Sequence, residues 1–400
     1  MIAGVLAAVL SLGDVESAAI AHAPAVTEAR ARISEQQALL DAARGSGRPS
    51  AFATYAQAPQ AGTVGTVTQR LTTVGGQVVL GDVAARDPLI AQASAALRGA
   101  IASESNAERN ERTKSIGLYI DAIRTREVRT LRETIFNAAK ADRHAAELRF
   151  QTGDVPRLDV VRADVEVARS QADLAQARAD ETNALRTLAI EIGSDPATLA
   201  LPTLAQIATP VTEPPTLDAA VSAALVRRPE IAAARADVRA EEAALRAAHR
   251  GVLPALTVQA GYTTGVDTGI NVSGPSANVT LNVPLSNAAS GRARAEAARL
   301  AQAQARAAAA SQTVTVEVST AYESLRAQRE AVAASASARS EAQAEVRAAQ
   351  AGYREGASSS LDLADARRTY AQAAVADAIA RAALTQAALT FGLALGEEGP

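Results

Sequence analysis

The chain of 400 residues lacks several residue types that other classes of protein need. It has no cysteine, which excludes disulfides, thiolate metal sites and a lipidated N-terminal cysteine. Aromatic residues make up only 2% of the chain, so little volume is available to fill a large globular core. No stretch reaches the roughly 18 apolar residues of a spanning helix, so we expect no helical membrane insertion.

The residues that are present favour helices. Hydrophobic residues make up 48% of the chain, and alanine dominates them. Alanine packs helices closely, which is typical of long, thin helices. The net charge is only −3, and the two signs alternate along helical stretches. Because no basic patch with interleaved aromatics occurs, nucleic acid is not an expected partner.

The chain is an internal duplication. The segment from Leu12 aligns without a gap with the segment from Leu217, so that Pro24 matches Pro229. Farther on, residues 150–193 align with residues 353–396, and Gly153 matches Gly356. We therefore expect two copies of one design, each with the order helix, strand pair, very long helix, turn and helix.

This duplication predicts the domain boundaries. The first repeat covers 12–193, with a strand pair at about 50–74 and a tip at 151–157. The second repeat covers 217–396, with a strand pair at about 255–285 and a tip at 354–360. A proline-rich connector at 194–216 joins them, residues 1–11 are the remnant of a secretory signal or an irregular start, and 397–400 form a tail.

The positions of proline and glycine and the alternation of apolar residues support this order. The first helix of each repeat should end before Pro49 or Pro254, because the residue before proline is pushed out of the α region. Beyond each proline, apolar and polar residues alternate with the period of a strand, and residues 265–275 should form the loop of the second pair. Between Gly291 and Gly352 there is neither proline nor glycine, which predicts a helix of roughly 90 Å. Its first-repeat counterpart should run from Pro88 to Gly153.

The returning helices carry apolar residues spaced 4, 3 and 4 apart, which is the pattern of helices that pack side by side. These residues are Leu384, Ala388, Phe391 and Leu395 in the second repeat, and Leu185, Leu188 and Ile192 in the first.

Together, the strand pairs between Ala-rich helices, the duplication and the turn motifs at Arg149–Gly153 and Tyr353–Gly356 resemble the TolC-like outer-membrane efflux protein family. The resemblance implies a mainly α fold with a small β part. Long helical hairpins would form a trimeric α-barrel, continued by a shared 12-stranded transmembrane β-barrel to which each chain gives four strands.

The resemblance also implies a function. The homotrimer would be an exit duct in the bacterial outer membrane, in contact with its lipid and extending into the periplasm. It would be a passive conduit of a tripartite efflux or type I secretion system, opened by docking to a periplasmic adaptor and an inner-membrane pump of the RND, ABC or MFS type.

By the same resemblance, the gate at the periplasmic entrance would contain Asp362, Asp365, Asp159 and Tyr353. Acidic residues in the first turn of a helix are also favoured by its dipole, so Asp159 and Asp362 have a simple capping explanation as well. The basic residue usual in the family falls here at Ser358, which implies a rewired gate. The adaptor would contact the two tips, formed by Thr152, Gly153, Asp154, Val155, Glu355, Gly356, Ala357 and Ser358.

Local roles at the tips follow from residue type. Gly153 and Gly356 should adopt positive φ and end the long helices, while Asp154 and Ser359 should cap the returning ones. Phe52, Tyr55 and Tyr262 lie in the strand regions and are candidates for the membrane interface or for strand packing.

We find no pattern of an enzyme or a cofactor site. His22, His144 and His249 have no neighbour at metal-ligand spacing, and no nucleophile triad or phosphate loop is present. Two other readings stay open: a periplasmic adaptor, which has only one helical hairpin, and a helical bundle without a channel, which leaves the strands unexplained.

Overall fold

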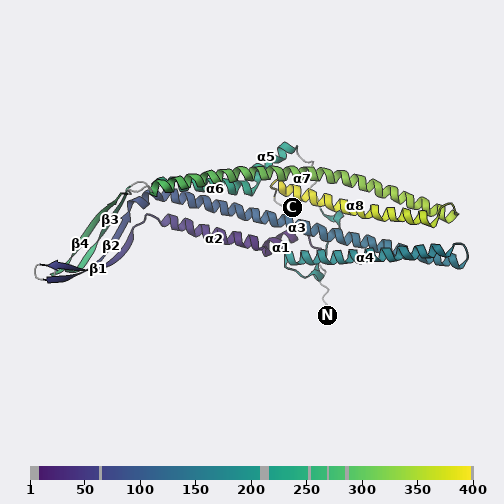
Figure 1. Ribbon diagram of the computed structural model, residues 1–400, viewed down its shortest axis with the longest axis horizontal. Helices are drawn as coiled ribbons and strands as arrows, with labels where there is room; N and C mark the ends of the chain where they lie inside the picture. Colours follow the sequence, from purple (N-terminus) through teal and green to yellow (C-terminus); the bar gives the residue numbers. More distant parts are fainter. Residues whose placement is uncertain are drawn as a thin grey trace. The chain divides into compact units, whose positions relative to one another are not determined.

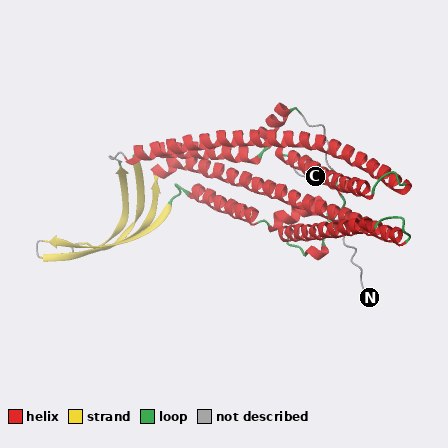
Figure 2. Ribbon diagram, turned by 45° about the vertical axis from the view of Figure 1, so that its right-hand side comes forward, coloured by secondary structure: helices red, strands yellow, loops and turns green. Residues whose placement is uncertain are grey.

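The computed structural model describes residues 9–62, 65–207, 216–250, 254–267, 270–283 and 288–397. Contacts divide the chain into two compact units (Figures 1 and 2). Unit 1 comprises 1–27, 106–228 and 313–400, and unit 2 comprises 28–105 and 229–312. In chain order the main elements are α1 (Leu12–His22), α2 (Pro24–Gly45), β1 (Ser50–Gly62), β2 (Gly65–Val79), α3 (Leu80–Gln151), α4 (Arg157–Ile192), α5 (Leu217–Arg227), α6 (Pro229–Arg250), β3 (Ala255–Asp267), β4 (Ile270–Asn282), α7 (Ala288–Glu355) and α8 (Ser360–Ala394).

The first helix of each repeat is two helices, which corrects the sequence prediction of one. The break falls before Pro24 and before Pro229, where Ala23 and Arg228 have extended backbone with ψ of 119° and 132°. The rule that places a helix end before Pro49 and Pro254 acts equally at these earlier prolines. Short 3-10 helices at Pro196–Thr198 and Leu204–Gln206 follow α4.

The two very long helices are α3, with 72 residues, and α7, with 68. The prediction of a helix from 291 to 352 is confirmed. In the first repeat, however, α3 begins at Leu80 and contains Pro88, so the predicted start at Pro88 is wrong. Proline removes one backbone hydrogen bond without ending this helix. Among the described residues, no helix has an apolar stretch long enough to serve as a membrane span.

All four strands form one antiparallel sheet in the order β1-β2-β3-β4. Gly75 of β2 lies opposite Gly261 of β3, so the strand pairs of the two repeats are joined in one sheet. The strands are longer than the sequence predicted. β3 reaches Asp267 and β4 begins at Ile270, so the loop predicted at 265–275 is wrong, because Gly265, Ser273 and Gly274 pair as strand residues. Within the described chain, β1 and β4 have no second strand partner.

The core of unit 1 lies where α1, α3, α4 and α8 meet. Tyr119 is buried there, and its hydroxyl donates a 2.7 Å hydrogen bond to the carbonyl of Leu10. The predicted apolar residues of the returning helices contribute to this packing, since Leu188, Ile192, Phe391 and Leu395 are buried. The core also includes Val15, Ile116, Ile120, Ile123, Leu389 and Leu393.

Candidate functional site

The sheet of unit 2 has one apolar face. The pairing register places Val78, Val258 and Val279 in one row across the strands, with Leu256 and Leu281 in the next row. Two rows from Val78, in the direction away from Leu256, Val74 lies between Ala53 and Tyr262 on the same face. The apolar band from Leu256 to Thr264 spans about 26 Å along the strand, before any tilt. It ends at the row of Arg70 and Gln57.

The opposite face of the sheet is polar, and its side chains bond across the strands. Thr73 and Thr263 share a 2.9 Å hydrogen bond between their hydroxyls, and Thr263 donates to Ser276 at 3.0 Å. The Gln259 amide donates to the side-chain oxygen of Gln77 at 2.8 Å. Asp267 accepts a bond from Gln69, and no other acidic or basic side chain lies on this face among the described strand residues.

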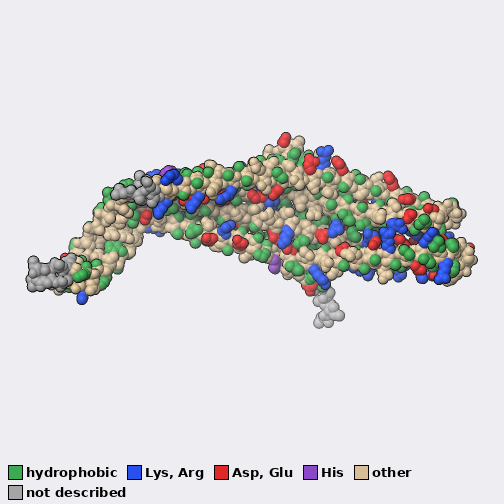
Figure 3. Space-filling view, in the orientation of Figure 1, with side chains coloured by type: hydrophobic (Ala, Val, Ile, Leu, Met, Phe, Trp, Pro, Cys, Tyr) green, Lys and Arg blue, Asp and Glu red, His purple; other side chains and the backbone are tan. Residues whose placement is uncertain are grey.

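Exposure of the two faces is the reverse of that in a water-soluble sheet. Val74 is 58% exposed, Tyr262 54% and Val279 62%, whereas Thr73 and Thr263 on the polar face are only partly exposed. Figure 3 shows the sheet almost without charged side chains, while both signs cover the helices. A large exposed apolar surface marks contact with a partner or with lipid.

The aromatic candidates lie on different faces. Tyr55 and Tyr262 are on the apolar face, in neighbouring rows, and both are more than half exposed. Phe52 lies on the polar face, in the row of Gly75 and Gly261. The two tyrosines therefore lie on the exposed apolar face, whereas Phe52 does not.

The first tip connects α3 to α4. Gly153 has a φ of 84°, as predicted, and the amide of Asp154 donates to the carbonyl of Arg149 at 2.9 Å. The prediction that Asp154 caps α4 is wrong: its carboxylate accepts a 2.6 Å hydrogen bond from the Thr152 hydroxyl. The N-cap position of α4 is Pro156, whose side chain makes no capping bond.

The second tip connects α7 to α8. Gly356 has a φ of 78°, and Ser359 caps α8, so both predictions are confirmed. Asp362 completes a capping box, in which its carboxylate accepts bonds from the amide and the hydroxyl of Ser359, both at 2.8 Å. These bonds lower the pKa of Asp362, which therefore stays ionised. Ser358 packs over Gly352 at the end of α7.

Contacts between the two tips bring three of the four predicted gate residues into one region. The hydroxyl of Ser360 donates to Asp159 at 2.6 Å, and Arg162 donates to Ser360 at 3.1 Å. The guanidinium of Arg149 lies 5.0 Å from the centre of the Tyr353 ring. Asp362 lies in the same region, because it follows Ser360 by two residues in the first turn of α8.

Asp365 lies one turn farther along α8. Its carboxylate is 55% exposed and forms a 3.0 Å ion pair with Arg368 on the same helix.

Sequence reasoning missed a second link between the hairpins. Arg367 on α8 pairs with Asp142 on α3. Burial raises the pKa of the Asp142 carboxyl, and the nearby Arg367 partly opposes this. Neither residue belongs to a sequence motif. The pair depends on how α3 and α8 are rotated about their axes, which the sequence pattern does not show.

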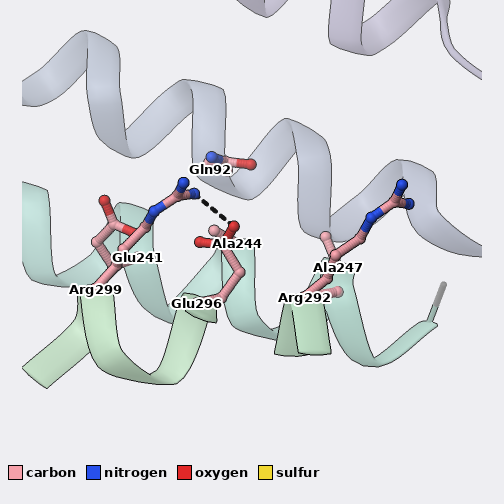
Figure 4. A pocket seen from close by; sticks show the side chains of 8 residues that line it. Gln92, Glu241, Ala244, Ala247, Arg292, Glu296 and Arg299 are labelled. Atoms are coloured by element: carbon pink, nitrogen blue, oxygen red, sulfur yellow. Dashed lines mark hydrogen bonds and ion pairs between the residues drawn. The ribbon is translucent and has the colours of Figure 1, made fainter. Parts of the chain in front are cut away.

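A pocket in unit 2 lies among α3, α6 and α7, and is lined by Gln92, Glu241, Arg292, Glu296 and Arg299 (Figure 4). Arg299 pairs with Glu296 at 2.6 Å. Two acids and two bases line the pocket, so it has no net preference for an anion or a cation. The described residues contain no cluster of His, Cys, Asp and Glu arranged to hold a metal ion.

The chain is similar in sequence to one protein family and in structure to several solved proteins. Residues 220–397 match the family model described as outer membrane efflux protein. The outer-membrane channel OprN is 20% identical, with a TM-score of 0.81 over 97% of this chain and 90% of that one. The MtrE outer membrane channel of Neisseria gonorrhoeae, in its open state, is 20% identical, with a TM-score of 0.80 over 97% and 89%.

The CmeC outer membrane channel of Campylobacter jejuni is 14% identical, with a TM-score of 0.78 over 96% of this chain and 85% of that one. Among curated proteins, none matches the chain at a significant level. The resemblance inferred from the turn motifs and the duplication is thereby confirmed. Residues 220–397 match the model of the outer membrane efflux protein family, and the chain as a whole has the fold of the solved outer-membrane channels.

Proposed function

We propose that this chain is one third of an exit duct in the bacterial outer membrane, through which an efflux or type I secretion system releases its cargo. The observation that carries the proposal is the sheet whose apolar face is exposed and whose polar face is hydrogen-bonded. An apolar band facing lipid and a polar lining facing water are the two surfaces of a membrane barrel.

The open edges of the sheet support assembly into a trimer. β1 and β4 lie at the edges, and their outer backbone groups have no strand partner in the described chain. Unpaired backbone groups are not tolerated in the hydrocarbon of a membrane, so the edges must be closed by other strands. Three copies with four strands each give a closed barrel of twelve, with β1 of one copy beside β4 of the next.

We assign the periplasmic gate to the tips. Asp159, Ser360 and Arg162 join the two hairpins, as do Asp142 with Arg367. Separating the hairpins would break these contacts, so they hold the entrance closed. In the family a basic residue stands at the position of Ser358. Here Ser360 and Arg367 of α8 make the contacts to the other hairpin instead.

The acidic gate residues differ in what else they do. Asp362 is already used in a capping box, whereas Asp365 lies beyond the first turn, is exposed and is paired only within its own helix. Three copies of Asp365 around one axis would form a ring that favours cations.

The turns at the tips are the surface we assign to the adaptor. Thr152, Gly153 and Asp154 are exposed at the first turn, and Glu355, Gly356 and Ala357 at the second, with Val155 and Ser358 half-buried beside them. An adaptor bound at this end of the helices would link the duct to an inner-membrane pump, and the pump would supply the energy for transport.

Membrane fractionation and mass measurement test the proposal. The expressed protein should be in the outer-membrane fraction and, in detergent, should have three times the chain mass of 41.0 kDa. A monomer that stays in solution without detergent would support the helical bundle without a channel. A protein recovered with the inner membrane would support the periplasmic adaptor instead.

A further inference from the structure

The sheet carries a single basic residue. Residues 50–79 and 255–282, which contain the four strands and their connections, include only two charged residues, Arg70 and Asp267. The pairing register places these two on opposite faces. Asp267 lies on the polar face and accepts a 3.0 Å hydrogen bond from Gln69, whereas Arg70 lies on the apolar face and is exposed. The apolar face of the described strands therefore has no carboxylate that could pair with Arg70.

Arg70 lies at the outer end of the apolar face. β1 is connected to β2, and β3 to β4, at the end of the sheet opposite to that from which the helices continue. Val266, the partner of Arg70 on β3, is ten residues beyond Leu256, which is about 33 Å along the strand. With the tilt of strands in membrane barrels, this length gives a height of about 25 Å, which is the height of their apolar band. The row of Arg70 is therefore at the level of the lipid headgroups in the outer leaflet.

A second hydrogen-bond donor lies beside the guanidinium. Gln57 of β1 is directly opposite Arg70 on the same face, and such pairs have Cβ atoms about 5 Å apart. The side-chain oxygen of Gln57 accepts a 3.1 Å hydrogen bond from the Tyr55 hydroxyl, which leaves the amide nitrogen as the group that can bind a ligand. A guanidinium and an amide nitrogen are both donors, so together they fit an oxyanion and not a cation.

Assembly of the barrel adds no counter-charge. In the proposed trimer, β4 of one copy lies beside β1 of the next, and β4 contains no acidic residue. An arginine at the edge of the hydrocarbon can extend its guanidinium to the headgroups, where it binds a phosphate through two parallel hydrogen bonds. The phosphate groups of lipids are the oxyanions present at this level of a membrane.

We propose that Arg70 and Gln57 form a binding site for the phosphate of a lipid headgroup in the outer leaflet, one site on each copy. This inference rests on the proposed function, because it requires the apolar face to contact lipid. The site selects a headgroup whose phosphate keeps its negative charge, as in the phosphorylated glycolipid lipid A. Phosphatidylcholine binds more weakly, since its own ammonium group neutralises its phosphate.

Native mass spectrometry of the trimer in an uncharged detergent tests the site, with lipid A and phosphatidylcholine as probes. The natural protein should bind up to three molecules of lipid A, and more tightly than phosphatidylcholine. Arg70→Gln should weaken lipid A binding about fivefold per site, the effect of one basic residue at an anionic membrane surface. Gln57→Leu should weaken it less. The matched control is Arg326→Gln, which removes the same charge from an exposed position on α7 and should bind lipid A like the natural protein.

Three results would contradict the proposal, and they are distinguishable. A trimer of Arg70→Gln that binds lipid A as tightly as the natural protein overturns the site while leaving the proposed duct intact. Displacement of lipid A by inorganic phosphate would overturn the assignment to a lipid, because the acyl chains of a bound lipid also contact the apolar face. A natural protein that never forms a trimer contradicts the proposed function itself.

Discussion

Single residues set how closely the strands approach one another. A Cβ atom at Gly75 would overlap the carbonyl oxygen of Ala260, and one at Gly261 would lie 2.6 Å from the carbonyl oxygen of Val74. At the neighbouring Gly76, a Cβ would meet nothing closer than 3.9 Å. Residue type predicted the positive φ of Gly153 and Gly356, but not this contact, because it depends on the register between two strands far apart in sequence.

Alanine at these glycines separates the two cases. Gly75→Ala forces β2 and β3 apart, a cost of at least about 1–3 kcal/mol for overpacking, and should reduce the yield of folded trimer. Gly76→Ala should assemble like the natural protein. The measurement is the fraction of trimer in detergent extracts of the membrane, and equal yields for both variants would show that the close approach is not needed.

Asp365 and Asp362 should differ in the open duct. Asp365→Asn removes an exposed charge and should lower the cation preference measured as a reversal potential across a planar bilayer. Asp362→Asn weakens the capping box and should mainly lower thermal stability. If Asp362→Asn changes the reversal potential more than Asp365→Asn does, the assignment of the acidic ring is reversed.

Glu16 on α1 is predicted to make stability depend on pH. Its side chain is buried, one carboxyl oxygen has no hydrogen-bond partner, and burial raises its pKa above the ordinary 4.5, with Arg112 opposing. The folded state therefore favours the protonated form, and stability falls as the pH rises through the raised pKa. Glu16→Gln should raise the melting temperature at pH 8 and leave it almost unchanged at pH 4. A gain of equal size at both pH values would exclude this cause.

At the scale of elements, the two helical hairpins are held together differently. Arg129–Glu181, Arg132–Asp173 and Arg143–Asp164 connect α3 to α4 at 2.8–2.9 Å. Between α7 and α8, the buried Asp377 binds Arg339 of α7 at 2.8 Å and Arg381 of α8 at 3.0 Å. Its aligned residue in the first repeat is the buried Leu174. The duplication predicted matching hairpins, but substitutions since then have changed how each one packs.

Removing Asp377 should therefore affect one hairpin strongly. Asp377→Ala leaves Arg339 and Arg381 without their shared partner and should cost about 1–3 kcal/mol, since both arginines are partly exposed. Asp173→Ala, at a partly exposed pair, should cost less than about 1 kcal/mol. Amide hydrogen exchange along α7 and α8 measures the difference. Faster exchange confined to α3 and α4 in Asp377→Ala would contradict it.

At the scale of the whole molecule, the sequence predicted the repeat, the strand pairs and the tips, because each follows from local periodicity. It did not predict the breaks before Pro24 and Pro229 or the continuation of α3 through Pro88, where local rules compete with helix packing. It also did not predict the Asp142–Arg367 pair, because helix rotation is set by contacts along the full length of the hairpins.

The central claim is that the polar face of the sheet lines an aqueous pore while the apolar face contacts lipid. Because the chain has no cysteine, single cysteines can report on each face. In single-channel recordings, a charged, water-soluble thiol reagent should change the conductance of Thr263→Cys in up to three steps, one for each copy. The same reagent should leave the conductance of Val258→Cys unchanged. Modification of Val258→Cys but not of Thr263→Cys, or the absence of any conductance from the trimer, would contradict the account.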